Sequence, residues 1–373
     1  MPAASSSLIS TSVPDTGIYE VLARVPDPRA RRGVRHRFTV ILVLALAATC
    51  AGARSFTAIA EWVHDAPSAV LDRLGVDSGV PSESTIRRTL SRVDSAMLDR
   101  ILGAWMWLRT SVFDGRRVIA VDGKTLRGAK HAAGNLTHLL AALDHHAGVV
   151  LGQCEVGAKT NEIPKLTELL DPLDLIDAVV TADALHCQRG TAEYIVGRGG
   201  HYVFTVKANQ PSLRSRLKAL PWNDIPESSS VASRGHSRRE RRTIKATEVA
   251  AGLGFPHATQ VLQVRRTVTR SGRQSVEVVY LISSLPMTAA APHQVAAWIR
   301  GHWSIENRLR WVRDVTFDED RSTIRTGTAP QVMASLRNTA IGCLRLAGHT
   351  NIAAALRHHS RHPHRPAELL LTI

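Results

Sequence analysis

The 373-residue chain has few cysteines, and they show no paired spacing. Cys50, Cys154, Cys187 and Cys343 lie far apart, which argues against a disulfide framework and against a zinc ribbon. His186 precedes Cys187 directly, but two adjacent ligands without a second pair are weak evidence for zinc. This cysteine usage fits a reducing cytoplasm.

The chain also lacks a long hydrophobic run. Its most apolar stretch, residues 38–53 (FTVILVLALAATCAGA), is shorter than the roughly 18 to 20 residues that span a bilayer. We therefore expect a buried core helix there and no membrane partner. The chain starts with small, polar residues instead of a charged segment followed by an apolar one, so no secretion signal is expected.

Acidic residues are in short supply relative to basic ones. The chain has 47 Lys plus Arg against 32 Asp plus Glu, a formal net charge of +15. Such an excess is typical of a protein with a polyanion partner, and nucleic acid is the leading candidate. The alternative is a basic surface that serves only solubility or reflects an arginine-rich genome, so charge alone does not decide.

The N-terminal third is predicted to be helical, with one long helix over residues 85–108 that Ser82 or Ser84 can cap. Arg87, Arg88 and Arg92 fall away from its apolar face. A helix offered to DNA has this pattern, and so does an ordinary solvated face.

From Val118 onward the apolar pattern changes to short, mostly buried strands. Three of them follow one another, and two more alternate with helices. This order predicts an α/β fold with a mixed sheet flanked by helices, of the ribonuclease H-like kind. A polar, basic stretch with three further strands comes next and predicts a β-rich insertion.

The pattern divides the chain into six parts. They are a mobile tail (1–16), an all-helical N-terminal region for DNA binding or an accessory role (17–113), the first part of a catalytic core (114–211), the β-rich insertion (212–286), the last core helices (287–346) and a loosely held basic tail (347–373).

Three acidic residues are candidates for a metal site. Asp122 and Asp183 each stand at the end of an apolar strand, where two carboxylates of one sheet can share hard cations such as Mg²⁺. In a helix over residues 296–315, Glu306 would share a face with His302, Arg310 and Arg313. Taken singly, each acid also fits a structural role, because Asp caps turns and Glu lies on solvated faces.

Several strings of the sequence resemble one family. They are VPDPRARRGVRHRF (25–38), SFTAIAEW (55–62), PSESTIRRTL (81–90), AVDGKTLRGA (120–129), HLLAALDH (138–145), VGAKTNEIP (156–164), VVTADALHCQ (179–188), HYVFTVKANQP (201–211) and HWSIENRLRWVRDVTFDED (302–320). They resemble the ISAs-one family of bacterial insertion-sequence transposases, which includes the H-repeat-associated proteins.

This resemblance implies a transposase of the Asp-Asp-Glu (DDE) type, with Asp122, Asp183 and Glu306 as catalytic metal ligands. The implied cofactor is Mg²⁺, for which Mn²⁺ can substitute. The implied partners are double-stranded DNA, at the transposon ends and the target, and further copies of the chain in a homodimer or larger assembly. A cytoplasmic, nucleoid-associated protein is expected.

Further basic residues are expected to contact DNA. Lys124 and Arg127 follow the first Asp, Lys207 ends a strand at the same sheet edge, and His302 stands near the Glu. A dense cluster in the insertion contributes His236, Arg238, Arg239 and Arg242. Arg310 and Arg313 stand where relatives carry His and Leu, and we expect them to clamp the scissile strand.

Two other functions remain open at this point. The chain could be a ribonuclease H-like, structure-selective nuclease that cuts DNA without joining it. It could also be an inactive copy that binds terminal repeats and represses its relatives, although intact acidic residues argue against that.

Overall fold

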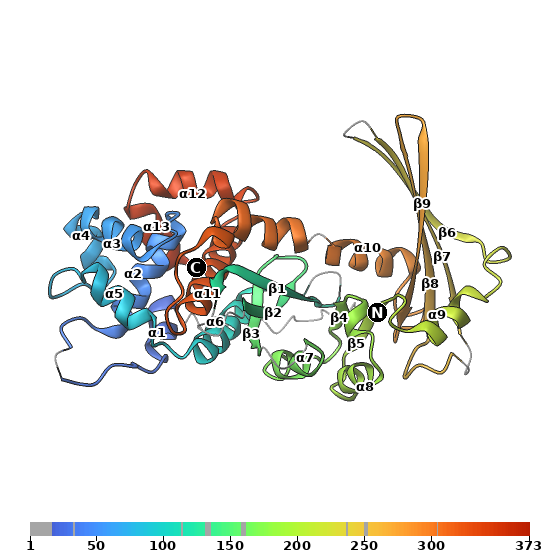
Figure 1. Cartoon of the computed structure of the whole chain (residues 1–373), viewed down its shortest axis with the longest axis horizontal. Coiled ribbons are helices and arrows are strands. Elements are labelled where there is room, and N and C mark those ends of the chain that lie inside the picture. The colour runs from blue at the N-terminus through green and yellow to red at the C-terminus, as the bar shows by residue number, and fades with distance from the viewer. Residues whose placement is uncertain are drawn as a thin grey trace, which may run out of the picture.

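The computed structural model describes residues 17–32, 34–112, 115–130, 136–157, 162–235, 238–249, 253–303 and 305–373, without the side chains of residues 129, 130, 306 and 307. The predicted tail at 1–16 lies outside the described residues. Along the long axis, helices from both ends of the chain form one end of the molecule. A sheet with flanking helices forms the middle, and four long strands form the other end (Figure 1).

The N-terminal region is helical, as predicted. Its helices are α1 (Ile18–Ala23), α2 (Phe38–Cys50), α3 (Phe56–Asp65), α4 (Ser68–Arg73), α5 (Glu83–Leu90) and α6 (Ser95–Arg109). The apolar run forms α2, in which 12 of 13 residues are buried, so the prediction of a core helix is confirmed. Among the described helices, none is both long and apolar enough to cross a membrane.

The single long helix expected over residues 85–108 is wrong, because α5 ends at Leu90 and α6 begins at Ser95. The Asp94 carboxylate accepts a hydrogen bond from the Met97 amide at 2.9 Å and caps α6. Val93 lies between the two helices and is buried, so the apolar pattern continues without interruption from α5 into α6. The spacing of apolar residues alone therefore could not reveal where one helix ends and the next begins.

The centre of the molecule is a mixed sheet. Its strands are β1 (Val118–Lys130), β2 (Leu136–Asp144), β3 (Val150–Val156), β4 (Val179–Ala182) and β5 (His201–Val206), in the order β3-β2-β1-β4-β5. The first three pair antiparallel, and β4 and β5 run parallel to β1. Helices α7 (Glu162–Leu170) and α8 (Arg189–Gly197) alternate with the later strands and lie together below the sheet in Figure 1. This strand order confirms the predicted ribonuclease H-like sheet.

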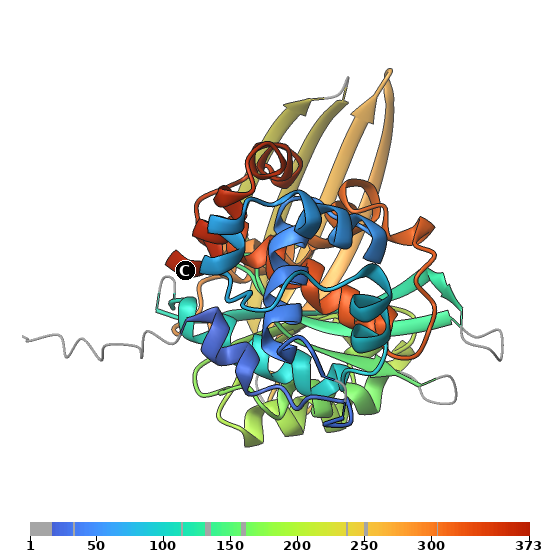
Figure 2. The ribbon, with the colours of Figure 1, turned by 90° about the vertical axis from the view of Figure 1, so that its left-hand side faces the viewer.

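The β-rich segment extends the same sheet. After α9 (Pro211–Lys218) come β6 (Glu227–Gly235), β7 (Arg238–Glu248), β8 (Gln260–Arg270) and β9 (Arg273–Ser283), all antiparallel to their neighbours. Strand β9 pairs with β5 and so joins the segment to the core. The strands project well beyond the helical body in the turned view (Figure 2). Sequence patterning predicted β7, β8 and β9 but missed β6, whose ESSSVASRG sequence has almost no apolar residues.

The chain ends in helices. They are α10 (Pro292–Trp303), the π-helical turns η2 (Glu306–Arg310) and η3 (Val312–Thr316), the short η4 (Glu319–Arg321), α11 (Ala329–Leu346), α12 (Ile352–Ser360) and α13 (His364–Thr372). The loosely held tail expected over 347–373 is wrong, because α12 and α13 bury Ile352, Leu356 and Leu370. They pack against the N-terminal helices, so the two ends of the chain share one core.

Candidate functional site

A cleft of 270 Å³ opens where β4 ends beside β1. The prediction that Asp122 ends its strand is wrong, because β1 continues past it to Lys130 in its pairing with β2. Val121 pairs with Ala182 in the parallel register, so Asp122 and Asp183 directly follow neighbouring residues. Both aspartates line the cleft, together with Lys207 beyond the end of β5. The parallel register thus brings together two acids that are 61 positions apart in sequence (183 minus 122).

The two aspartates are held differently. Asp122 is half-buried, and the Arg310 guanidinium donates to its carboxylate and to the Gly123 carbonyl. Asp183 is more exposed and accepts a hydrogen bond from the Leu185 amide at 2.9 Å, which caps the short turn η1 (Ala184–His186). Each carboxylate therefore has a fixed orientation before any substrate arrives.

His302 lines the cleft from α10 and is almost completely buried. Its Nδ1 lies 3.2 Å from the Thr181 hydroxyl, which is also 3.0 Å from Nε2 of His145. Burial lowers the pKa of His302 to about 4, although the Asp183 charge acts in the opposite direction. His302 is therefore neutral near pH 7 and can take part in hydrogen bonding but not in charge neutralisation.

Glu306 lies in η2, and its side chain is outside the described part of the structure. Trp303, Ile305 and Arg310 from the same stretch line the cleft, so this stretch forms one of its walls. Among the side chains that the structure describes, no group of three or more His, Cys, Asp or Glu could hold a metal ion.

A hydrogen-bonded cluster beside the cleft escaped sequence reasoning. Glu162, at the start of α7, accepts from His138 of β2 at 2.7 Å and from His186 of η1 at 3.1 Å. Burial alone would raise the pKa of Glu162, but these two hydrogen bonds outweigh it and bring the value to about 2. A Cβ on Gly123 would overlap the Glu162 carboxylate, so a larger residue next to Asp122 would displace that carboxylate from its present position. Only the string VGAKTNEIP pointed to this residue, and the string gives no role.

Lys124, which the sequence predicts to contact DNA, does not line the cleft. Its ammonium group contacts Asp314, lies 3.6 Å from Glu319 and 3.5 Å from Asp320, and is largely buried. Arg127 is exposed and lies 3.8 Å from Asp320.

The sequence predicts that Arg313 contacts the scissile DNA strand, but only 1% of its side chain is exposed. It forms a two-pronged ion pair with Glu319 at 2.9 and 3.0 Å, and Arg337 contacts the same carboxylate at 2.9 Å. Burial would raise the pKa of Glu319, yet these arginines lower it to about 2. Since a π-helix takes more residues per turn than an α-helix, positions seven apart no longer share a face, and Arg313 turns away from the cleft.

The basic cluster of the β-rich segment lies on β7. Arg238 and Arg239 are exposed, whereas Arg242 pairs with the buried Glu240 at 2.7 Å. His236 falls outside the described residues. The strands project beyond the helical body (Figure 2), but Glu277 and Val279 of β9 line the cleft, and Arg242 borders a hollow with Trp303, which lines the cleft as well.

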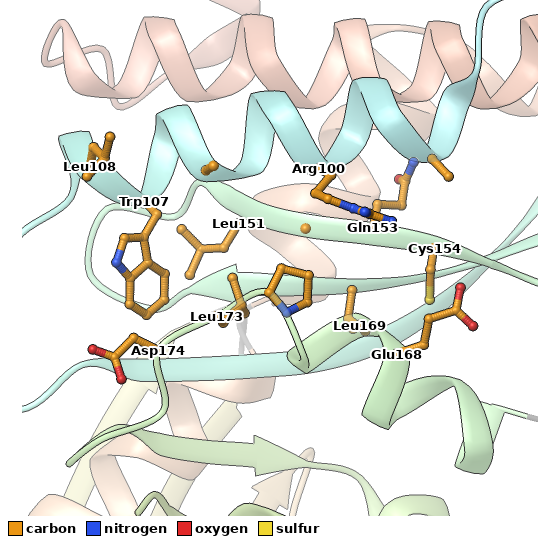
Figure 3. A pocket seen from close by; sticks show the side chains of 14 residues that line it. Arg100, Trp107, Leu108, Leu151, Gln153, Cys154, Glu168, Leu169, Leu173 and Asp174 are labelled. Carbon is orange, nitrogen blue, oxygen red and sulfur yellow. The ribbon is translucent and has the colours of Figure 1, made fainter. Parts of the chain in front are cut away.

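A second cavity of 310 Å³ lies between α6, β3 and the end of α7 (Figure 3). Trp107, Leu151, Leu169 and Leu173 face it, and the charged groups of Glu168 and Asp174 stand at its edges in the view. Its mainly apolar lining lacks the grouping of carboxylates and cations found in the first cleft. We therefore regard the β1 and β4 cleft as the candidate active site.

Family profiles match most of the chain. A profile described as "Transposase DDE domain" matches residues 114–343, and one described as "DDE_Tnp_1-associated" matches residues 19–106. The first covers the strands of the cleft and the stretch with Glu306.

Among curated proteins, the chain is similar to "Putative transposase YncI" of Escherichia coli O157:H7, with 32% identity over 88% of this chain and 87% of that protein. It is also similar to "H repeat-associated putative transposase YhhI" of Escherichia coli K12, with 31% identity over 88% of this chain and 90% of that protein.

Among solved structures, the chain matches the cryo-EM structure of the piggyBac transposase synaptic complex with hairpin DNA. The match has a TM-score of 0.43 and 12% identity, and it covers 89% of this chain and 73% of that one. At this level of overlap, the fold assignment depends on the strand order of the chain itself and on its family profiles.

Proposed function

Since this chain belongs to the DDE transposase family, we propose that it binds the ends of its own insertion sequence, hydrolyses the phosphodiester there and transfers the freed 3′-hydroxyl end into target DNA. The observation that carries the proposal is the cleft where Asp122 and Asp183 lie beside cationic groups. Carboxylates that can bind metal and cations that can bind phosphate are the combination that phosphoryl transfer requires.

In this proposal Asp122, Asp183 and Glu306 hold Mg²⁺, for which Mn²⁺ can substitute. Their carboxylate oxygens are the donors that hard divalent cations prefer. The parallel register of β1 and β4 supports the fit, because it brings the carboxylates of Asp122 and Asp183 to one cleft. When bound, such cations supply the charge that activates the attacking oxygen and stabilises the leaving oxygen.

The remaining cleft residues would position the scissile phosphate. Arg310 and Lys207 line the cleft with positive charge, which favours the phosphate oxygens as charge develops in the transition state. Neutral His302, hydrogen-bonded to Thr181 at 3.2 Å, would keep its ring in a fixed orientation at the cleft wall. A substrate held in one geometry reacts faster, because less freedom is lost on the way to the transition state.

The projecting strands would bind the DNA backbone. Arg238 of β7 is directly opposite Arg270 of β8, which is in turn opposite Arg273 of β9. Like charges opposite each other destabilise a sheet, unless an anion compensates them. A phosphate backbone across these strands would offset the repulsion, and in the proposal a homodimer or larger assembly holds two such ends together.

A plasmid carrying the element's ends tests the proposal and separates its rivals. Purified protein with Mg²⁺ should nick the ends and should join a precut end to target DNA. Cutting without joining would indicate a structure-selective nuclease. End binding without any cutting would indicate an inactive repressor, and the absence of both would remove DNA as the partner.

A further inference from the structure

A second basic cleft lies in the helical N-terminal region. It has a volume of 580 Å³ and is formed by the connection between α1 and α2 on one side and α5 with the turn after it on the other. Its charged lining consists of Arg29, Arg32, Arg35, Arg88 and Arg92, with His36 among them. Among the described residues that line it there is no aspartate or glutamate.

The acids of these two segments are paired with other arginines. Asp27 forms an ion pair with Arg29 at 2.8 Å, and Glu83 pairs along α5 with Arg87 at 3.3 Å. Arg32, Arg35, Arg88 and Arg92 are exposed and form no ion pair with the described residues. The cleft therefore has four cationic side chains whose charge the protein does not neutralise.

Such convergence is unfavourable in the free protein, because several like charges face one another across a concave wall. A bound anionic ligand would turn this electrostatic repulsion between the arginines into attraction to the ligand. Guanidinium groups match the geometry of phosphate oxygens, and the hydroxyls of Ser82 and Thr85 in the same lining add neutral hydrogen-bonding groups. Because these arginines come from two separate chain segments, an extended polyanion can contact more of them at once than a single small ion can.

We infer that this N-terminal arginine cleft, formed around Arg32, Arg35, Arg88 and Arg92, binds the phosphate backbone of duplex DNA. The inference rests on the proposed function, which makes DNA the substrate. The cleft belongs to helices at one end of the long axis, whereas the β6 to β9 strands form the other end and the strands of the candidate active site lie between (Figure 1). The protein would thus hold duplex backbone at two surfaces on either side of the site of cutting.

Salt-dependent binding of a labelled duplex to the full chain tests this inference. Arg88→Ala with Arg92→Ala removes two of the proposed phosphate contacts, which should lower the slope of log affinity against log salt by about two. The matched control is Lys218→Ala with Arg361→Ala, which removes the same charge from two exposed positions outside the cleft and should leave the slope unchanged. Arg88→Lys with Arg92→Lys should restore the slope, since lysine still contacts phosphate as a point charge.

The outcomes separate the inference from the proposed function. A wild-type slope in the Arg88 and Arg92 double alanine variant, with normal DNA cutting by the wild type, would overturn the cleft and leave the function standing. An equal loss of slope in the Lys218 and Arg361 control would also overturn it, because the effect would then come from the net charge of the protein. Wild-type protein that binds polyglutamate as tightly as duplex DNA would make the cleft an acidic-peptide site, and wild-type protein that binds no DNA would overturn both.

Discussion

At the scale of single residues, two arginines of one motif have opposite environments. Arg310 is about one-third exposed and contacts Asp122 in the cleft, whereas Arg313 is buried against Glu319. The sequence predicted one role for both, because an α-helical spacing would place them on the face of Glu306. They should therefore respond differently to the same substitution.

Arg313→Ala should lower the free energy of unfolding by about 3 kcal/mol, because it removes a hydrogen-bonded partner from a buried carboxylate. Urea unfolding would measure the loss. Arg321, whose side chain is 86% exposed, is the control, and Arg321→Ala should change stability by no more than about 0.5 kcal/mol. Equal stability of the two variants would refute a structural role for Arg313.

Arg310→Ala should leave unfolding nearly unchanged and should slow the chemical step by roughly 10- to 1000-fold, as expected for lost positioning of the transition state. Single-turnover cleavage at saturating protein separates this effect from DNA binding. Arg310→Lys should recover part of the rate, because it keeps the positive charge. A wild-type rate in Arg310→Ala would mean that this side chain does not contact the scissile phosphate.

Acid should destabilise the protein through His145. Burial lowers the pKa of this residue to about 3, and its value in the unfolded chain is about 6.5. The unfolded state therefore binds more protons, and stability falls as the pH drops from about 6.5 towards 3. From pH 7 to pH 5 the loss from this group should be about 2 kcal/mol.

His145→Asn should remove that loss, and urea unfolding at the two pH values would measure it. Burial raises the pKa of Asp99 to about 7, which favours stability in the opposite direction over the same pH range. Asp99 is present in both proteins, so the difference between wild type and variant isolates His145. The same pH dependence in both would contradict the assignment.

At this scale the sequence predicted the positions of the two aspartates and missed Glu162. Each aspartate directly follows an apolar run, which a pattern can identify, although only Asp183 ends its strand and Asp122 lies within β1. Glu162 is one acid at the start of a helix, and its partners His138 and His186 come from a strand and a turn elsewhere in the chain. Only the folded sheet edge brings the three together.

At the scale of elements, the apolar pattern predicted which residues are buried better than it predicted which type of helix they form. The spacing of Ile305, Leu309 and Val312 in the sequence predicts a buried apolar stripe, and all three are buried. The α-helical winding assumed for them is wrong, because π-helical turns occupy this stretch. A π-turn depends on how the surrounding core accepts the side chains, and no spacing rule encodes that.

The C-terminal helices were hidden by their own composition. The histidines and arginines of RHHSRHPHRP indicated a solvated tail, but Leu356 precedes them and Leu369 and Leu370 follow within the range of two helices. These few apolar side chains complete the core around α2, a helix that is apolar on all sides and therefore has to be buried all round. The C-terminal helices are therefore part of the structure that holds the N-terminal region.

Leu370→Ala tests this role of the C-terminal helices. The side chain is 1% exposed, so its truncation should cost about 2 to 5 kcal/mol of stability. Thermal or urea unfolding would measure the loss, and Leu371→Ala is the adjacent control because that side chain is 46% exposed. Similar effects of the two substitutions would contradict a docked α13.

At the scale of the whole molecule, positive charge and function are distributed along the long axis. The formal net charge of +15 includes arginines at the N-terminal cleft and others on the projecting strands, such as Arg238 and Arg270. The composition predicted a polyanion partner, but it could not predict that the arginines form two separate groups. That separation arises because the N-terminal helices and the β6 to β9 strands lie at opposite ends of the molecule (Figure 1). DNA held at both ends would pass the cleft that carries the aspartates.

The most direct test of the account is nicking of a labelled element end by Asp122→Asn, Asp183→Asn and Glu306→Gln, with end binding measured in parallel. Each substitution removes a negative charge from the proposed metal site and little volume, so each variant should bind the end like wild type and fail to nick it in Mg²⁺. Nicking at the wild-type rate by any one variant would remove that residue from the site. Wild-type nicking by all three would show that the cleft between β1 and the end of β4 is not where DNA is cut.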